Sequence, residues 1–366
     1  MSPLADDTLL DDPARLGEVD SDGLLRAGAM AGAQVRATVA AAAESRLSEL
    51  EGARPRALVL ITRPGLGPAV SRILAALLQP SCPVPLVLTD TVPSWIGPLD
   101  VVLGHTDDPG DAVLAESIDR AARYGASVVI TAPEDGPVAA AAAGKAVLLE
   151  PRVHVPPGFG FARVLTAGLL TVKALRLLDT DIEALADELD REAERDHLQH
   201  ESFVNPAKSL ALRLADRSPL LWGLDDVATA VAAHAVQVLA THTDLVCDVT
   251  GYPQAMSGTA LHRAAVRASS GQDIFADPDD LDPGQASPLR VFLLAIRSAP
   301  GDPLRRLAAD TLPGADVLAP IEEISADAPA CAAVLALRFE LAALYLGLAS
   351  GTTGGSGRYA SAPGLR

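Results

Sequence analysis

The sequence predicts an α/β protein with two tandem, doubly wound parallel-sheet domains and flanking helices. Residues 205–249 read as a helix, a short apolar strand, a glycine-containing turn, a long helix and a second strand. Residues 57–88 repeat part of this order, with an apolar strand, a turn, a helix and another strand. Strands that alternate with covering helices form βαβ units and hence parallel sheets. A chain of 366 residues is long enough for two such domains.

Changes in composition along the chain predict its domain organisation. The expected parts are an N-terminal arm and helix over residues 1–51, a first sheet domain over 52–180, a charged helical connector over 181–204, a second sheet domain over 205–350 and a disordered Gly/Ser-rich tail over 351–366. The first 20 residues are acidic and without periodicity, so we expect a loose arm there. A polar, acidic loop is expected at about 270–288.

Apolar runs bounded by Gly, Pro or Asp predict the strands, and amphipathic or Ala-rich runs predict the helices. Expected strands cover residues 57–62, 85–88, 100–103, 127–131, 146–149, 220–222, 245–247, 290–296 and 316–318. Expected helices cover residues 28–43, 69–79, 109–124, 161–178, 179–199, 207–214, 225–241, 257–268, 303–312 and 327–350. Gly125 is expected to end its helix as a C-cap.

Composition excludes several classes of function. A formal net charge of −18 argues against a nucleic-acid partner, because phosphates require a basic face. The three cysteines form no CxxC motif and no HExxH motif occurs, so neither a metal nor a cofactor is expected. The N-terminus is acidic, and no uninterrupted apolar run reaches membrane-spanning length. We therefore expect a cytoplasmic protein with no membrane partner.

In an open parallel sheet, ligands bind outside the carboxyl ends of the strands, so the turns there are the candidate sites. The turn over residues 63–68 holds Gly65 and Gly67, whose N–H groups would meet an anion at a helix N-terminus. Pro64 and Pro68 each remove a donor, which favours a purely structural tight turn.

The next turn, over residues 104–111, offers His105 and Thr106 as donors to a substrate. It also contains three carboxylates, which would repel a phosphate. Asp108 precedes Pro109 and is expected to cap the following helix, so a structural interpretation explains the acidic residues as well.

The two predicted sheets and their turns resemble the double sugar-isomerase (SIS) fold. More narrowly, the chain resembles the bifunctional phosphoglucose/phosphomannose isomerases in their actinobacterial, TobH-like branch. The matching stretches are DGLL at residues 22–25, PPGFGFARVLTAG at 156–168, NPAKSLALRL at 205–214 and AALYLGLASG at 342–351. The resemblance implies a homodimer without a metal or cofactor. It also implies aldose–ketose isomerisation of sugar 6-phosphates through a cis-enediol, with a Glu base and a ring-opening His.

The chain departs from this family at the residues that carry the chemistry. Only Arg163, which matches the family's arginine after the Pro/Gly loop, is kept. The segment that carries the base aligns with residues 241–243, where His242 replaces the carboxylate. The segment that carries the ring-opening histidine aligns with residues 254–258, where Ser257 is the candidate substrate contact.

Two hypotheses follow. In the first, the protein binds a sugar phosphate, has little or no isomerase activity, and is retained as a binding protein or as a protein partner in hexose-phosphate metabolism. In the second, it is an active aldose–ketose isomerase with a rearranged site that uses Arg163 and His242, since an unperturbed imidazole pKa of about 6.5 suits a base. The structural interpretation of His242 is an imidazolium that interacts with the helix dipole.

Overall fold

The computed structural model describes residues 6–270 and 288–353, so the predicted acidic loop and most of the predicted tail lie outside the described residues. The chain divides into two compact units. We call residues 30–190 the first-sheet unit, and residues 1–29 together with 191–366 the second-sheet unit. The N-terminal segment therefore belongs with the second sheet, although it precedes the first in the sequence.

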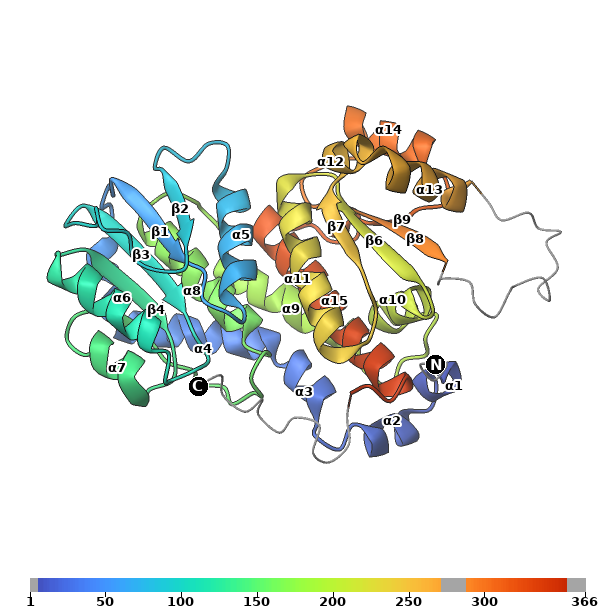
Figure 1. The fold of residues 1–366 in the computed structure, drawn as a ribbon. Coiled ribbons are helices and arrows are strands. Elements are labelled where there is room, and N and C mark those ends of the chain that lie inside the picture. The colour runs from blue at the N-terminus through green and yellow to red at the C-terminus, as the bar shows by residue number, and fades with distance from the viewer. Residues whose placement is uncertain (1–5, 271–287, 354–366) are drawn as a thin grey trace. The chain divides into compact units, whose positions relative to one another are not determined.

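The first-sheet unit contains a five-stranded parallel sheet in the order β2-β1-β3-β4-β5 (Figure 1). The strands are β1 (Ala57–Ile61), β2 (Leu86–Thr89), β3 (Asp100–His105), β4 (Ser127–Thr131) and β5 (Val147–Leu149). Helices cover both faces, which is why every residue of β1 and β3 is buried.

The helices of this unit are α4 (Ala31–Glu44), the short η1 (Arg46–Leu50), α5 (Gly67–Leu78), α6 (Ala112–Arg123), α7 (Gly136–Ala142), α8 (Phe161–Ala174) and most of α9 (Ile182–Arg195). On one face, α6 and α7 pack Leu114, Ile118 and Val138 against Val102 and Ile130 of the sheet. On the other face, α5 and α8 contact the sheet and each other, and α4 packs on α8. The carboxyl ends of β1 and β3 are thereby left at one edge of a rigid layer.

The second-sheet unit contains a four-stranded parallel sheet in the order β7-β6-β8-β9 (Figure 1). Its strands are β6 (Ser218–Gly223), β7 (Asp248–Gly251), β8 (Leu289–Leu294) and β9 (Asp316–Leu318). The order matches that of the first four strands of the other sheet. The prediction of two similar, doubly wound halves is confirmed.

The remaining helices are α1 (Asp7–Leu10), α2 (Pro13–Val19), α3 (Leu24–Ala29), α10 (Pro206–Leu214), α11 (Asp226–His242), α12 (Tyr252–Ser257), α13 (Thr259–Ser269), α14 (Pro303–Thr311), η3 (Pro320–Glu322) and α15 (Ala328–Ala349). One face of the sheet is packed by α12, α13 and α14 around Trp222 and Tyr252. The other is covered by α11, which packs on α15.

Helix α15 is the one described helix whose length and apolarity would suffice to cross a membrane. All of its residues except Ala328 and Glu340 are buried within the protein. It packs against α3, α10 and α11 of its own unit. This is the environment of a central core helix.

Three sequence expectations are wrong in detail. The segment predicted as a loose arm forms α1 and α2, because Asp12 caps α2 by accepting the N–H of Arg15 and the apolar side chains of this segment are buried. The cap of α6 is Asp111, which accepts the N–H of Leu114, rather than Asp108. Strand β7 begins after Cys247, at Asp248.

Candidate functional site

The strand order of the first sheet reverses between β1 and β3, so the crevice beyond their carboxyl ends is the expected ligand position. Gly65 lies in the turn after β1 with φ of +104°, a conformation that favours glycine. Gly67 is the first residue of α5, and a Cβ there would come within 3.9 Å of the carbonyl oxygen of His105. The structure therefore brings the two predicted turns together.

His105 and Thr106 end β3 and are both buried. The His105 Nδ1 atom lies 2.9 Å from the Thr131 hydroxyl and 3.1 Å from its carbonyl oxygen. The Thr106 hydroxyl accepts the N–H of Asp108. These contacts hold the loop in place and leave His105 Nε2 facing Asp107.

An ion pair joins Arg163 to Asp107, which lies in the loop after β3. Arg163 lies in the first turn of α8, and its Nη2 donates to Asp107 Oδ1 at 3.0 Å. The Arg163 side chain is 8% exposed, and its Nη1 has no hydrogen-bond partner within the described part of the chain. His105 Nε2 lies 3.5 Å from the same Asp107 oxygen, too far for a strong hydrogen bond. A buried guanidinium thus retains unused donor capacity beside a carboxylate.

Burial and the contact between the two side chains shift the pKa values of Asp107 and Arg163. Burial alone would raise the pKa of Asp107, but its contacts with His105 and Arg163 and a backbone N–H outweigh that effect and lower it. Burial lowers the pKa of Arg163, and Asp107 opposes this shift. Asp107 is therefore ionised at neutral pH and pairs with the charged guanidinium.

A second ion pair joins the loops after β1 and β3. Arg63 Nε donates to Asp111 Oδ2 at 2.8 Å, and both side chains are largely buried. The other Asp111 oxygen caps α6. The sequence predicted that the carboxylates of this turn repel a phosphate or satisfy a helix end, and the structure shows that two of them, Asp107 and Asp111, are also the partners of two arginines. The sequence did hint at these ion pairs, because Arg and Asp occur in the turns that follow adjacent strands. Which arginine pairs with which carboxylate could be seen only in the tertiary structure.

The other two predicted site residues belong to the second-sheet unit. His242 is the last residue of α11, which starts at the carboxyl end of β6 and runs back, so His242 lies toward the amino end of the sheet. It is buried beside Thr353, and burial lowers its pKa to about 4. The expected imidazolium at the helix end is therefore wrong. Ser257 ends α12, is exposed, and donates to the Gln254 carbonyl oxygen.

The NPAKSLALRL stretch, which carried part of the family resemblance, has a structural explanation. Asn205 caps α10 by accepting the N–H of Lys208 at 2.8 Å. The buried Lys208 ammonium donates to the carbonyl oxygens of Leu10, Leu198 and His200, at 2.6, 2.8 and 2.7 Å. All three protons of the ammonium are used, so this lysine ties the chain together and is not available to a substrate.

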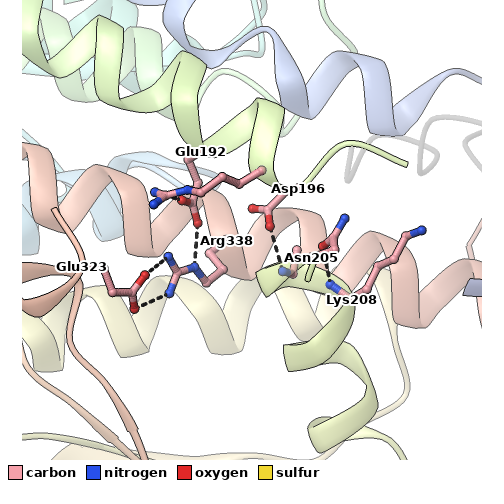
Figure 2. Close-up of polar contacts among 8 residues, drawn as sticks. Glu192, Asp196, Asn205, Lys208, Glu323 and Arg338 are labelled. Carbon is pink, nitrogen blue, oxygen red and sulfur yellow. Dashed lines mark hydrogen bonds and ion pairs between the residues drawn. The ribbon is translucent and has the colours of Figure 1, made fainter. Parts of the chain in front are cut away.

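Figure 2 shows the polar cluster beside this stretch, with Arg338 of α15 between Glu192 and Glu323. Asp196 accepts the N–H of Ala207 through one oxygen, and its other oxygen has no partner among the described residues. Burial and the neighbouring Glu192 raise the pKa of Asp196 well above its usual range. The cluster is an interior ion-pair network that supports α10 and α15.

Comparison with known proteins identifies the fold. No protein-family profile and no curated protein sequence matches the chain. Among solved structures, it is similar to the C-terminal domain of glucosamine-fructose-6-phosphate aminotransferase from Francisella tularensis, with 11% identity, a TM-score of 0.61, and coverage of 90% of this chain and 96% of that one. Tagatose-6-phosphate ketose/aldose isomerase from Escherichia coli gives 12% identity, a TM-score of 0.57 and coverage of 97% of both chains.

A glucose-6-phosphate isomerase-like protein from Thermus thermophilus gives 18% identity, a TM-score of 0.51, and coverage of 93% of this chain and 92% of that one. Because each match extends over nearly the whole of both chains, the likeness includes both sheet units. The predicted α/β fold with two parallel-sheet halves is confirmed, and it is the fold shared with these solved structures.

Proposed function

We propose that this protein binds a phosphorylated carbohydrate derivative in the crevice of the first-sheet unit and has little or no isomerase activity. The observation that carries the proposal is the buried Arg163 side chain, whose Nη1 has no partner within the described residues although it lies at the carboxyl edge of a parallel sheet. Buried guanidinium donors are normally paired, so an unpaired one at a ligand-binding edge favours an anionic ligand.

The surrounding groups suit a sugar phosphate of modest affinity. The start of α5 supplies a second, weaker anion-binding element at Gly67 and Ala69, because Pro68 between them has no N–H group. Asp107 already receives Arg163 Nη2, and its charge opposes that of a phosphate. The solved structures named for sugar 6-phosphates have the same fold, which makes this class of ligand the natural one to propose.

The same geometry argues against turnover. Removing a proton from the sugar requires a base within hydrogen-bonding reach, and a general base typically contributes roughly 10²–10⁴-fold. The crevice carboxylates of Asp107 and Asp111 both engage arginines. In the alternative function, an active aldose–ketose isomerase, His242 would be the base. It is instead buried toward the amino end of its sheet, with its pKa lowered to about 4.

The finer assignments are part of the same proposal. We place the protein in the TobH-like branch of the phosphoglucose/phosphomannose isomerases because of the four matching stretches. By that resemblance we propose a homodimer that serves hexose-phosphate metabolism as a binding protein or as a protein partner, and we propose a cytoplasmic location from the acidic N-terminus. Size-exclusion chromatography with light scattering tests the dimer, and a monomer at micromolar concentration would contradict it.

Calorimetric titration and thermal unfolding with fructose, glucose and mannose 6-phosphates test the binding. For a Kd of about 100 µM, 10 mM ligand stabilises the native state by about 2.7 kcal/mol. Arg163→Gln is expected to abolish the response. The matched control is Arg56→Gln, because Arg56 pairs with Asp100 at the opposite end of the same sheet and should leave binding intact.

A linked isomerase assay tests the lack of turnover. We expect no conversion above background, whereas a kcat above about 1 s⁻¹, the low end for ordinary enzymes, would contradict the proposal. Absence of any sugar-phosphate response in the wild-type protein would contradict the binding function itself.

A further inference from the structure

The second sheet reverses its strand order between β6 and β8, the counterpart of β1 and β3 in the first sheet. The loop after β6 carries Asp225, and the loop after β8 carries residues 296–298. The Asp225 Oδ2 atom accepts three successive backbone N–H groups, from Ile296 at 2.8 Å, Arg297 at 2.8 Å and Ser298 at 3.2 Å. Three amides that converge on one oxygen form a cradle of the kind that binds oxyanions in proteins.

The helix cap does not account for this arrangement. Asp225 caps α11 with its other oxygen, Oδ1, which accepts the N–H of Ala228 at 2.9 Å. A serine or an asparagine would serve that purpose equally well. The Oδ2 contacts join two loops that are more than 70 residues apart in the sequence, so they are a separate function of the same side chain.

Other features of the cradle also suit an anion. The Ser298 side chain is buried, with 5% of its surface exposed, and its hydroxyl has no partner among residues 6–270 and 288–353. The Arg305 guanidinium donates to the Ser298 carbonyl oxygen at 3.0 Å. Gly223 lets α11 approach closely, because a Cβ there would lie 2.4 Å from the Thr229 nitrogen. Ser298 thus supplies an unused hydroxyl donor beside the three amides, whereas the charge of Arg305 is already paired with Glu322.

We propose that residues 296–298 form an oxyanion-binding cradle whose resident occupant is the Asp225 carboxylate. The second-sheet crevice is therefore filled by the chain itself, and a tetrahedral oxyanion of the phosphate class binds there only when that carboxylate is removed. This inference does not depend on the ligand of the first-sheet unit.

Asp225→Ser tests the proposal, since serine keeps a cap for α11 and vacates the Oδ2 position. The probe is inorganic phosphate, and the background is Arg163→Gln so that the first-sheet crevice does not contribute. We expect a saturable, phosphate-dependent rise in Tm of several degrees for Asp225→Ser and none for the background protein. Asp302→Ser is the matched control, because Asp302 caps α14 through Leu304 and Arg305 without a cradle.

An equal response of the Asp302 control, or no response of Asp225→Ser, would overturn the proposal. Should the serine variant fail to fold, Asp225→Thr is the second variant, since threonine also caps a helix and lacks the Oδ2 atom. The same phosphate-dependent rise in Tm is expected for it, and a folded threonine variant without that rise would overturn the proposal.

Discussion

The two crevices differ in what holds their carboxylate. In the first-sheet unit, Asp107 is paired with the Arg163 side chain and remains 30% exposed, so the guanidinium has donors left for a ligand. In the second-sheet unit, Asp225 is bound by backbone amides that have no freedom to reorient. A carboxylate that neutralises a flexible cation leaves a site usable, whereas one that fills an amide cradle closes it.

The largest effect that tests this comparison is expected from Asp225→Ala. The change removes a helix cap and leaves three converging N–H groups without their acceptor, so we expect a loss of about 2–4 kcal/mol in the free energy of unfolding. The matched Asp302→Ala change removes only a cap and should cost about 1 kcal/mol. Urea denaturation measures both, and equal losses would show that the cradle contributes nothing.

Asp107→Asn should strengthen ligand binding in the first-sheet crevice. It removes the negative charge beside Arg163 and frees Nη2, so the affinity of the first-sheet crevice for fructose 6-phosphate is expected to rise about tenfold, or 1.4 kcal/mol. Calorimetric titration measures the change, and the effect should shrink at high salt. Unchanged or weakened affinity would mean that Asp107 does not compete with the ligand.

Asp196 is a third buried carboxylate, but it accepts only one backbone N–H, whereas Asp225 Oδ2 accepts three. Its charged form is therefore poorly stabilised, and this should show in the pH dependence of stability. Its pKa is raised in the folded protein, so the native state binds more protons than the unfolded state above the ordinary carboxyl pKa. Its contribution to stability is present at low pH and is lost as pH rises through the folded pKa. Asp196→Asn should therefore flatten this decline, as measured by Tm between pH 4 and pH 9. A parallel pH profile for the variant and the wild type would refute this interpretation.

The smallest effect on the crevices is expected from His242→Asn. His242 lies toward the amino end of its sheet and is neutral at pH 7, so the variant should bind sugar phosphates with the same affinity and should still show no turnover. Its Tm should fall, because the substitution alters a buried side chain. Selective loss of an isomerase activity in this variant would favour the active-enzyme alternative.

Much of the fold was predictable because its signals are local. Apolar runs such as the one at residues 57–62 place the strands to within a few residues, and the repeated order of elements predicts two parallel sheets. Asp225 was likewise expected at the start of its helix, where it does accept the N–H of Ala228. The acidic N-terminal segment was misjudged because α1 and α2 are short and have no periodicity to detect.

The sequence by itself determined the fold class, the position of most elements and the presence of arginines and carboxylates in the turns. Only the tertiary structure decided which of these groups meet. Arg163 and Asp107 are 56 residues apart, and Asp225 and its amide donors are more than 70 apart. The order in which strands pair places their loops side by side, and that order depends on packing across the whole sheet, which no local pattern encodes.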